Sequence, residues 1–168
     1  MTKPQQSTVG HTPKASLTCT ERFVEVLAWS GRRMYRFDPS AFQACFVPNV
    51  TKSDLGHALR TALAASRLLS SEEAIATMNR RALGDLLDEW VSEKLLRYDY
   101  KNKAQLYRGM KHVDVIGIGD EIRLSSLRQC RQNGWEPIEG PEAITVLPLD
   151  ASDEHLGAAA HAALARSF

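Results

Sequence analysis

One segment places two residues that could perform acid–base chemistry. His112 and Asp114 stand two positions apart in the run His112–Ile118, whose alternation predicts a β-strand, so both side chains should point to the same face. An imidazole beside a carboxylate can act as a general acid–base pair or supply half of a metal site. Asp120 and Glu121 are near, but no residue at a fitting spacing supplies a third ligand. We interpret these residues as structural or surface polar groups, with a hydrolase as an alternative.

Other catalytic and cofactor motifs are missing from the sequence. Gly117-Ile-Gly119 begins like a dinucleotide-binding loop, but Ile122 stands where the third glycine belongs, and a hairpin turn at Gly119-Asp120 explains the glycines. No P-loop, HExxH or GxSxG pattern is found, and the three cysteines form neither CxxC nor a zinc pattern. We therefore predict no catalytic residues, no metal and no cofactor, and reduced thiols in a cytoplasmic protein.

A basic and aromatic stretch, 97–111, could clamp RNA. Lys101, Lys103 and Arg108 alternate there with Tyr98, Tyr100 and Tyr107. Stacking bases on tyrosines beside cations is a common way to bind single strands. The chain as a whole carries a formal net charge of only +1, which argues against a global electrostatic mode of nucleic-acid binding. An RNA-binding module is therefore the alternative function, and a solvated loop with half-buried tyrosines is favoured.

Two acidic tracts could instead meet a basic protein. The first recurs at helical spacing on one predicted helix face, and the second includes every charged side chain from Gln132 to His155. Complementary charge raises association rates and sets specificity.

The remaining features predict one α+β domain. A chain of 168 residues suits a single domain, and with 43% hydrophobic and 24% charged residues it reads as globular. No apolar run is long enough for a transmembrane helix, and no signal peptide is expected. Residues 1–20 are polar and are predicted to form a flexible arm, with the domain spanning 21–168. We expect a mixed, mostly antiparallel central sheet covered by helices.

The predicted elements follow from apolar periodicity and turn signals. A helix should start at the capping box of Ser70 and Glu73 and run to about Arg97, bending at Gly84. Its buried face should comprise Leu83, Leu86, Leu87, Trp90 and Leu95. Strands are predicted at 22–29, 32–37, 42–47, 112–118, 121–124 and, buried, 143–147; a short helical turn is predicted at 103–109 and an irregular segment at 126–132.

Two strand–helix segments of the sequence echo each other. When Leu55-Gly56 is aligned on Leu156-Gly157, alanines and leucines coincide along both helices, and Ser66 falls on Ser167. An alanine-rich face lets a helix lie close to a sheet. The sequence therefore predicts a possible internal strand–helix pseudo-repeat, with chance similarity of two Ala/Leu helices as the alternative.

The block Tyr98-Asp-Tyr-Lys-Asn-Lys103, followed by Tyr107 and Met110-Lys111, resembles one found in a family of bacterial contact-dependent growth inhibition (CDI) immunity proteins, CdiI. Trp135 after a glycine and the closing helix from Ser152 are also similar, so the resemblance covers roughly Phe23 to Arg166. The chain departs from the family pattern in ending with Ser167-Phe168 instead of a cysteine, and in a hairpin at 112–127 that is only loosely similar.

The resemblance implies a cytoplasmic inhibitor that binds the C-terminal toxin domain of a cognate CDI effector and has neither catalysis nor cofactor. Such toxins are often nucleases, tRNases above all, with basic substrate grooves. The resemblance identifies no contact positions, so the predicted toxin-binding residues rest on charge, with Trp135 as a candidate anchor. They are Asp85, Asp88, Glu89, Glu93, Trp135, Glu136, Glu139 and Glu142.

Overall fold

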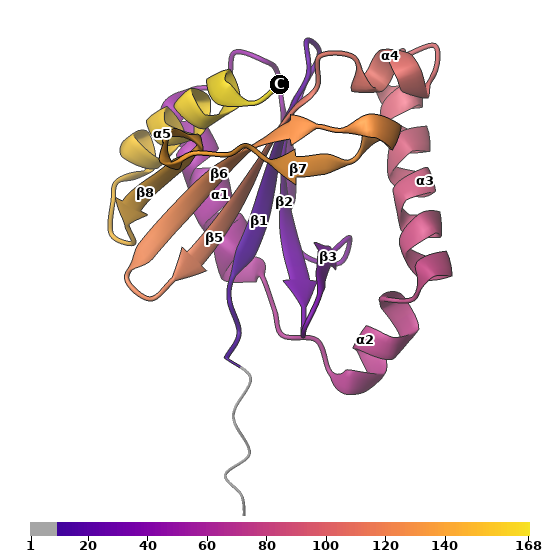
Figure 1. Ribbon diagram of the computed structural model, residues 1–168, viewed down its shortest axis with the longest axis horizontal. Helices are drawn as coiled ribbons and strands as arrows, with labels where there is room; N and C mark the ends of the chain where they lie inside the picture. The colour runs from indigo at the N-terminus through magenta and orange to yellow at the C-terminus, as the bar shows by residue number, and fades with distance from the viewer. Residues whose placement is uncertain (1–9) are drawn as a thin grey trace, which may run out of the picture.

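An antiparallel sheet organises the computed structural model, which describes residues 10–168. Its strand order is β3-β2-β1-β5-β6-β7, with β4 pairing along β2 and β8 along β6 (Figure 1). Within residues 10–168 every strand pair is antiparallel, and one isolated parallel bridge joins Gly31 to Leu68. The predicted α+β class is confirmed. The strands are β1 Lys14–Cys19, β2 Val24–Gly31, β3 Tyr35–Phe37, β4 Gln43–Phe46, β5 Lys111–Ile118, β6 Glu121–Gln129, β7 Trp135–Pro137 and β8 Ile144–Pro148.

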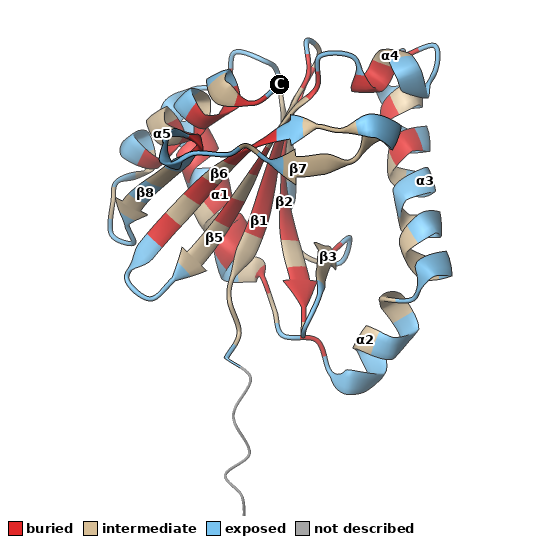
Figure 2. Cartoon of the chain, in the orientation of Figure 1, coloured by how far each residue is buried: buried red, intermediate tan, exposed pale blue. Residues whose placement is uncertain are grey.

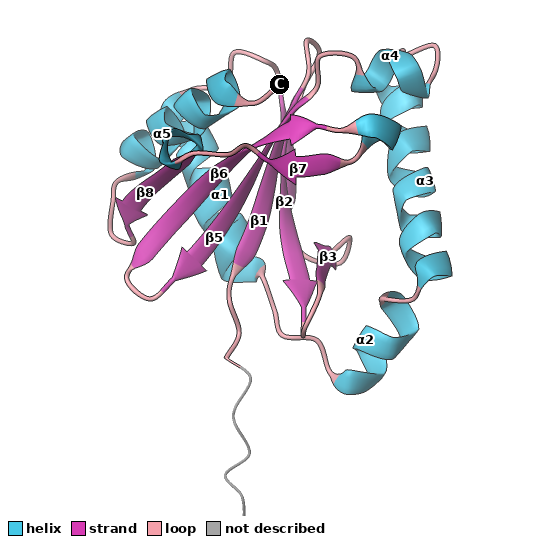
Figure 3. Cartoon of the chain, viewed as in Figure 1, coloured by secondary structure: helices cyan, strands magenta, loops and turns pink. Residues whose placement is uncertain are grey.

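Helices cover the two faces of this sheet unequally. Helices α1 and α5 pack together on one face, whereas α2 and α3 stand beside the other (Figures 1 and 3). Buried residues are concentrated along the central strands, and α3 is largely exposed (Figure 2). Among the described residues, no helix is long and apolar enough to cross a membrane. The helices are α1 Lys52–Ala65, α2 Ser71–Thr77, α3 Arg80–Arg97, α4 Lys103–Tyr107 and α5 Asp153–Arg166, with 3₁₀ turns at Arg131–Asn133 and Pro141–Ala143.

The N-terminal boundary predicted for the domain is wrong. Strand β1 lies in the middle of the sheet, hydrogen-bonded to β2 on one side and β5 on the other. The predicted arm therefore cannot extend to Thr20, and its residues 1–9 lie outside the described part of the chain. The sequence of this strand looks polar because its core-facing residues, Ala15, Leu17 and Cys19, alternate with Ser16 and Thr18 on the opposite face.

Two glycines let α1 and α5 touch at their backbones. A β-carbon on Gly56 would overlap the carbonyl oxygen of Asp153, and one on Gly157 would overlap that of Lys52. The two contacts are reciprocal: each glycine faces the first residue of the other helix. The Leu-Gly pairs that align in the sequence are therefore the crossing point of the two helices.

The pseudo-repeat extends from these helices to the sheet. In one half, β2 pairs with β1 along one edge; on the other edge, the C-terminal end of β2 pairs with β3 and its N-terminal part with β4. In the other half, β6 takes the place of β2. It pairs with β5 along one edge, and on the other edge its C-terminal end pairs with β7 and its N-terminal part with β8. The two halves join where β1 meets β5. The strand pairing thus follows an approximate twofold relation.

The serines that end α1 and α5 repeat the same contacts. The hydroxyl of Ser66 donates to the carbonyl of Trp29 at 2.5 Å, and that of Ser167 donates to Leu127 at 2.6 Å. Each hydroxyl also accepts a backbone N–H from the next strand, β1 or β5. Each serine therefore ties its helix end to two strands, as the alignment of Ser66 on Ser167 suggested.

The prediction of one long helix from Ser70 to Arg97 is wrong in one respect. The capping box of Ser70 and Glu73 is present, but the helix breaks at Met78–Asn79 instead of bending at Gly84. Asn79 caps α3 by accepting a hydrogen bond from the N–H of Ala82 at 2.9 Å. The predicted apolar face of α3 is at most half-buried, and the buried residues of α3 are Val91 and Lys94.

Two strand predictions also need correction. Strand β6 continues to Gln129, through most of the segment predicted to be irregular, because Ser126 and Leu127 bury against α5 and its C-terminal cap. Strand β8 pairs only with β6, and its residues alternate between exposed and half-buried. The prediction of a buried strand is therefore wrong. Strand β8 lies at the edge of the sheet, and only every second side chain points toward the core.

Candidate functional site

A groove separates α3 from the face of the sheet that α1 and α5 leave uncovered. Two adjoining cavities make up this α3 groove, one of about 240 Å³ and one of about 350 Å³. Phe37 of β3 and Trp90 of α3 line both. Because α3 packs on the sheet through few buried residues, the space beneath it is not filled by the chain itself.

The smaller cavity, called here the aromatic cleft, contains all three tryptophans of the chain. Trp29 comes from β2, Trp90 from α3 and Trp135 from β7, and each is half-buried. Tryptophan offers a large apolar surface with one polar N–H, which suits it to recognition sites. Besides these, the lining consists of Ser16, Thr18, Leu27, Phe37, Leu87, Tyr107, Met110, His112 and Asn133.

Polar side chains form the floor of the aromatic cleft. The indole N–H of Trp29 donates to Ser16 Oγ at 2.7 Å. Thr18 Oγ1 lies 3.0 Å from Nδ1 of His112, and the ring of Trp135 stacks on His112 with centroids 5.1 Å apart. Burial lowers the pKa of His112 to about 4, against the opposing charge of Asp114. The cleft therefore has aromatic walls and an uncharged polar floor.

The predicted pair of His112 and Asp114 shares one face of β5, as expected, but the geometry does not favour acid–base chemistry. Nε2 of the histidine is 3.8 Å from the carboxylate, which Lys14 approaches more closely, at 3.3 Å. The imidazole is only 12% exposed, because the ring of Trp135 stacks on it. Within residues 10–168, no cluster of three His, Cys, Asp or Glu side chains could hold a metal ion. His112 is better explained as part of the cleft floor, and Asp114 as the ion-pair partner of Lys14.

The larger cavity of the α3 groove is polar. Glu89 and Glu93 of α3 line it, together with Cys45 of β4 and a buried ion pair of Glu25 and Lys94. In the described part of the chain, no cation lies within 4 Å of the Glu89 carboxylate. This side of the groove can therefore accept a cation from outside.

The predicted toxin-binding residues fall into two groups. Asp85, Asp88, Glu89 and Glu93 all lie exposed on α3, and Trp135 joins them at the groove because β7 brings it against His112. The connection from β7 to β8, which carries Glu139 and Glu142, runs instead toward α5 (Figure 1). Glu136 is half-buried and pairs with Arg128 at 2.7 Å. The structure thus brings Glu89, Glu93 and Trp135 to the groove. Asp85 and Asp88 lie on α3 outside its lining, and so does the second tract.

Sequence reasoning missed four residues of the groove: Trp29, Trp90, Glu25 and Lys94. Trp90 was expected in the core, and Lys94 was not among the candidate residues. One signal could have identified Lys94, since it follows Leu87, Trp90 and Val91 on the apolar side of α3. For Trp29 and Glu25 the sequence offers no such signal, because strand position alone does not show which face of a sheet stays uncovered.

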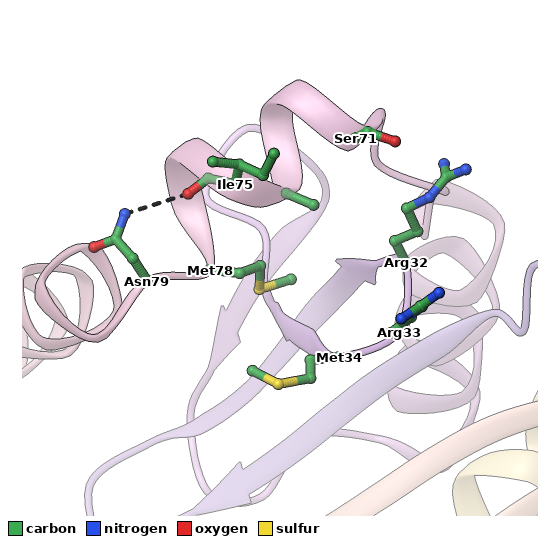
Figure 4. Close-up of a pocket in the computed structure, with 8 residues that line it drawn as sticks. Arg32, Arg33, Met34, Ser71, Ile75, Met78 and Asn79 are labelled. Carbon is green, nitrogen blue, oxygen red and sulfur yellow. Dashed lines mark hydrogen bonds between the residues drawn. The ribbon is translucent and has the colours of Figure 1, made fainter.

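A second surface groove lies between α2 and the turn that leads into β3. Its volume is about 580 Å³, and Met34, Ile75 and Met78 extend into it while Arg32 and Arg33 flank it (Figure 4). Met34 and Ile75 are strongly exposed, at 58% and 77%. Asn79 also lines the groove, and the figure shows its side-chain amide directed at the backbone carbonyl of Ile75.

The tyrosines of the 97–111 stretch are not available for stacking. Tyr100 is 6% exposed and Tyr107 5%, and both belong to an apolar cluster around Phe23. The hydroxyl of Tyr100 is 2.9 Å from Thr20 Oγ1, and Tyr98 stacks on Phe23. Tyr100 and Tyr107 are therefore more deeply buried than predicted, whereas Tyr98 is half-buried as expected, with one ring face covered by Phe23.

Comparisons with known proteins agree on one family. The family model CdiI, described as CDI immunity protein, matches residues 13–167. The immunity protein CdiI-YPIII of Yersinia pseudotuberculosis serotype O:3 (strain YPIII) is 29% identical over 166 residues, covering 90% of this chain and 93% of the relative.

Two solved structures have the same fold. One is the CdiA-CT/CdiI toxin and immunity complex from Yersinia pseudotuberculosis, with a TM-score of 0.85 and 27% identity over 95% of this chain and 99% of the matched chain. The other is the protein of unknown function NMB0488 from Neisseria meningitidis, with a TM-score of 0.88 and 24% identity over the whole of both chains. At that identity the second match shows the fold alone.

Proposed function

The chain belongs to the CdiI family of CDI immunity proteins, and we propose that it binds and neutralises the C-terminal toxin domain of a cognate contact-dependent growth inhibition effector. The observation that carries this proposal is the match to the family over residues 13–167, together with the similarity to a chain of a toxin–immunity complex over nearly its full length. The protein acts in the cytoplasm of the producing cell by occupying the toxin's surface, and catalyses no reaction itself.

The α3 groove is the surface best suited to the toxin. It offers three tryptophans in a cleft with an uncharged polar floor, and such aromatic clusters supply most of the binding energy at protein interfaces. The acidic residues of α3 stand beside it, and Asp88 and Glu89 have no cation within 4 Å among the described residues. A basic toxin surface would complement this helix.

The toxin is, on this proposal, a nuclease, and most consistently a tRNase. Nuclease active sites are basic because they bind phosphates, and carboxylates on α3 could form charge-assisted hydrogen bonds with the same lysines and arginines. Purified toxin domain should cleave tRNA, and equimolar addition of this chain should stop cleavage. A toxin that leaves all nucleic acids intact but is still neutralised would refute the nuclease assignment alone.

Charge reversal tests the contact residues. Replacing Asp88, Glu89, Glu136 and Glu139 by lysine should weaken toxin binding by orders of magnitude, because each substitution replaces an attraction with a repulsion. Titration calorimetry at moderate salt gives the affinity. Because the structure separates the tracts, Asp88→Lys/Glu89→Lys and Glu136→Lys/Glu139→Lys should also be measured as separate pairs, and the α3 pair should have the larger effect.

A matched control carries the same charge change at another place. Asp120, Glu121, Asp150 and Glu154 are exposed near the β5–β6 turn and the start of α5. Their reversal to lysine should leave affinity within a few-fold of the unaltered protein, since distant exposed charges are screened at moderate salt. Equal losses in both sets, or none in the first, would reject the assignment of these contacts.

A further inference from the structure

The anchoring of α3 on the sheet is unusual because it is ionic. Lys94 is 3% exposed and Glu25 only 1%, and their Nζ and Oε1 atoms lie 2.5 Å apart. Val91 and Lys94 are the buried residues of this 18-residue helix. One of the two buried residues of α3 therefore carries a charge.

Trp90 is held by the same carboxylate. Its indole N–H donates to Oε2 of Glu25 at 2.8 Å, while Oε1 binds the ammonium of Lys94 and accepts from the thiol of Cys45 at 3.4 Å. The ammonium of Lys94 also lies 5.8 Å from the centroid of the Trp90 ring, and Glu93 Oε2 approaches it at 2.5 Å. Burial disfavours the charge of Lys94, but Glu25 and Glu93 outweigh it and raise the pKa of the lysine above its ordinary value.

Stability alone does not explain such a pair. Removing two charges from water costs free energy that their attraction often fails to recover, and apolar residues of similar volume are commonly as stable or more so. An ion pair that shares a hydrogen bond also fixes geometry. It permits only one orientation of the Trp90 indole and one position of α3 along the sheet. Trp90 is also the residue of α3 that lines both cavities of the groove.

We propose that Glu25 and Lys94 are positioning residues for toxin binding, which fix Trp90 and the height of α3 above the sheet so that the α3 groove stays open. The proposal rests on the proposed function, since it requires a toxin that enters this groove. Neither side chain is exposed enough to be a major contact itself, so any effect on affinity must act through the residues they hold.

Replacing both residues of the pair by apolar ones tests whether the pair affects toxin affinity independently of protein stability. In the double variant Glu25→Leu/Lys94→Met, the denaturation midpoint should equal or exceed that of the unaltered protein, while affinity for the toxin domain should fall roughly ten-fold or more, the effect of displacing one anchor residue. Unchanged affinity would overturn the proposal. A variant that fails to fold would overturn it too, because the pair would then be required for the fold.

A conservative variant provides the rescue. In Glu25→Gln/Lys94→Met the charges are gone, but the glutamine oxygen can still accept the indole N–H of Trp90. Affinity should recover part of the way toward that of the unaltered chain, because Trp90 is held again while the contact of Lys94 is still missing. The same loss as in the leucine variant would contradict the positioning of Trp90 by Glu25.

The control is an ion pair on the opposite face of the sheet. Arg60 Nε lies 2.8 Å from Asp153 Oδ1, where α1 meets α5. The double variant Arg60→Met/Asp153→Leu should keep its toxin affinity whatever happens to its stability, and an equal loss there would overturn the inference. If the unaltered protein does not bind its toxin at all, the proposed function fails, and that result is distinct from the outcomes above.

Discussion

Individual polar residues of this protein take their properties from the face of the sheet they occupy. His112 was expected to be a surface or structural polar residue, and its position on β5 sharing a face with Asp114 was predictable from alternation alone. Its burial was not, because Trp135, which covers it, comes from a strand 23 residues further along the chain. A contact between residues so far apart in the chain cannot be predicted from the residues next to His112.

The buried His112 should make the protein sensitive to mild acid. Its pKa of about 4 in the folded state lies below the ordinary value of 6.5, so the unfolded chain binds more protons between these values. The free energy of unfolding should fall as the pH drops from about 6.5 to 4, by roughly 3 kcal/mol in all. Urea denaturation at several pH values measures this decline.

The variant His112→Gln isolates the contribution of this residue. Glutamine can keep a hydrogen bond to Thr18 but does not titrate, so stability should change less with pH over the same range. Lys14 and Asp114 face the same group and remain in both proteins, which makes the difference between the two curves specific to the imidazole. Parallel curves would show that the histidine does not control the acid response.

Among the elements, the paired helices α1 and α5 were the most predictable. Their caps, Thr51 and Ser152, and their Ala/Leu faces are all readable in the sequence. The break between α2 and α3 was missed because the Ser70 capping box starts a pattern that stays helical on both sides of Asn79, and a mid-pattern asparagine is a weak signal beside it. The boundary between α2 and α3 is set by the cap at Asn79, which a search for hydrophobic periodicity does not detect.

The contact between α1 and α5 predicts a sensitive glycine. Gly56→Ala should destabilise the protein by about 1–3 kcal/mol, although alanine favours helix, because its methyl group would meet the backbone of Asp153. Gly84→Ala is the matched control within another helix, since nothing lies within 4 Å of its β-carbon position. That substitution should stabilise by about 0.5–1 kcal/mol. Thermal or chemical unfolding that ranks the two in the opposite order would disprove the close crossing.

At the scale of the molecule, the sequence indicated the α+β class and the repeat but not the extent of the sheet. Alignment of the two Leu-Gly helices showed the similarity of α1 and α5, whereas the matching strand pairs share too few residues to be aligned. Strand β1 was assigned to a flexible arm because Ser16 and Thr18 line the aromatic cleft and not the core. The groove could not be predicted, since it forms where the chain leaves a sheet face uncovered.

The segment that joins the two halves, 67–110, supplies α2, α3 and α4 and so one whole wall of the α3 groove, while the repeated strands and helices form the scaffold beneath it. The toxin contacts proposed for α3 can therefore change without altering the repeated strands and helices of the scaffold. A chimera that carries this segment from the Yersinia relative should lose protection against its own toxin and gain some against the relative's, as a growth competition would measure. Unaltered protection would mean that specificity resides in the framework.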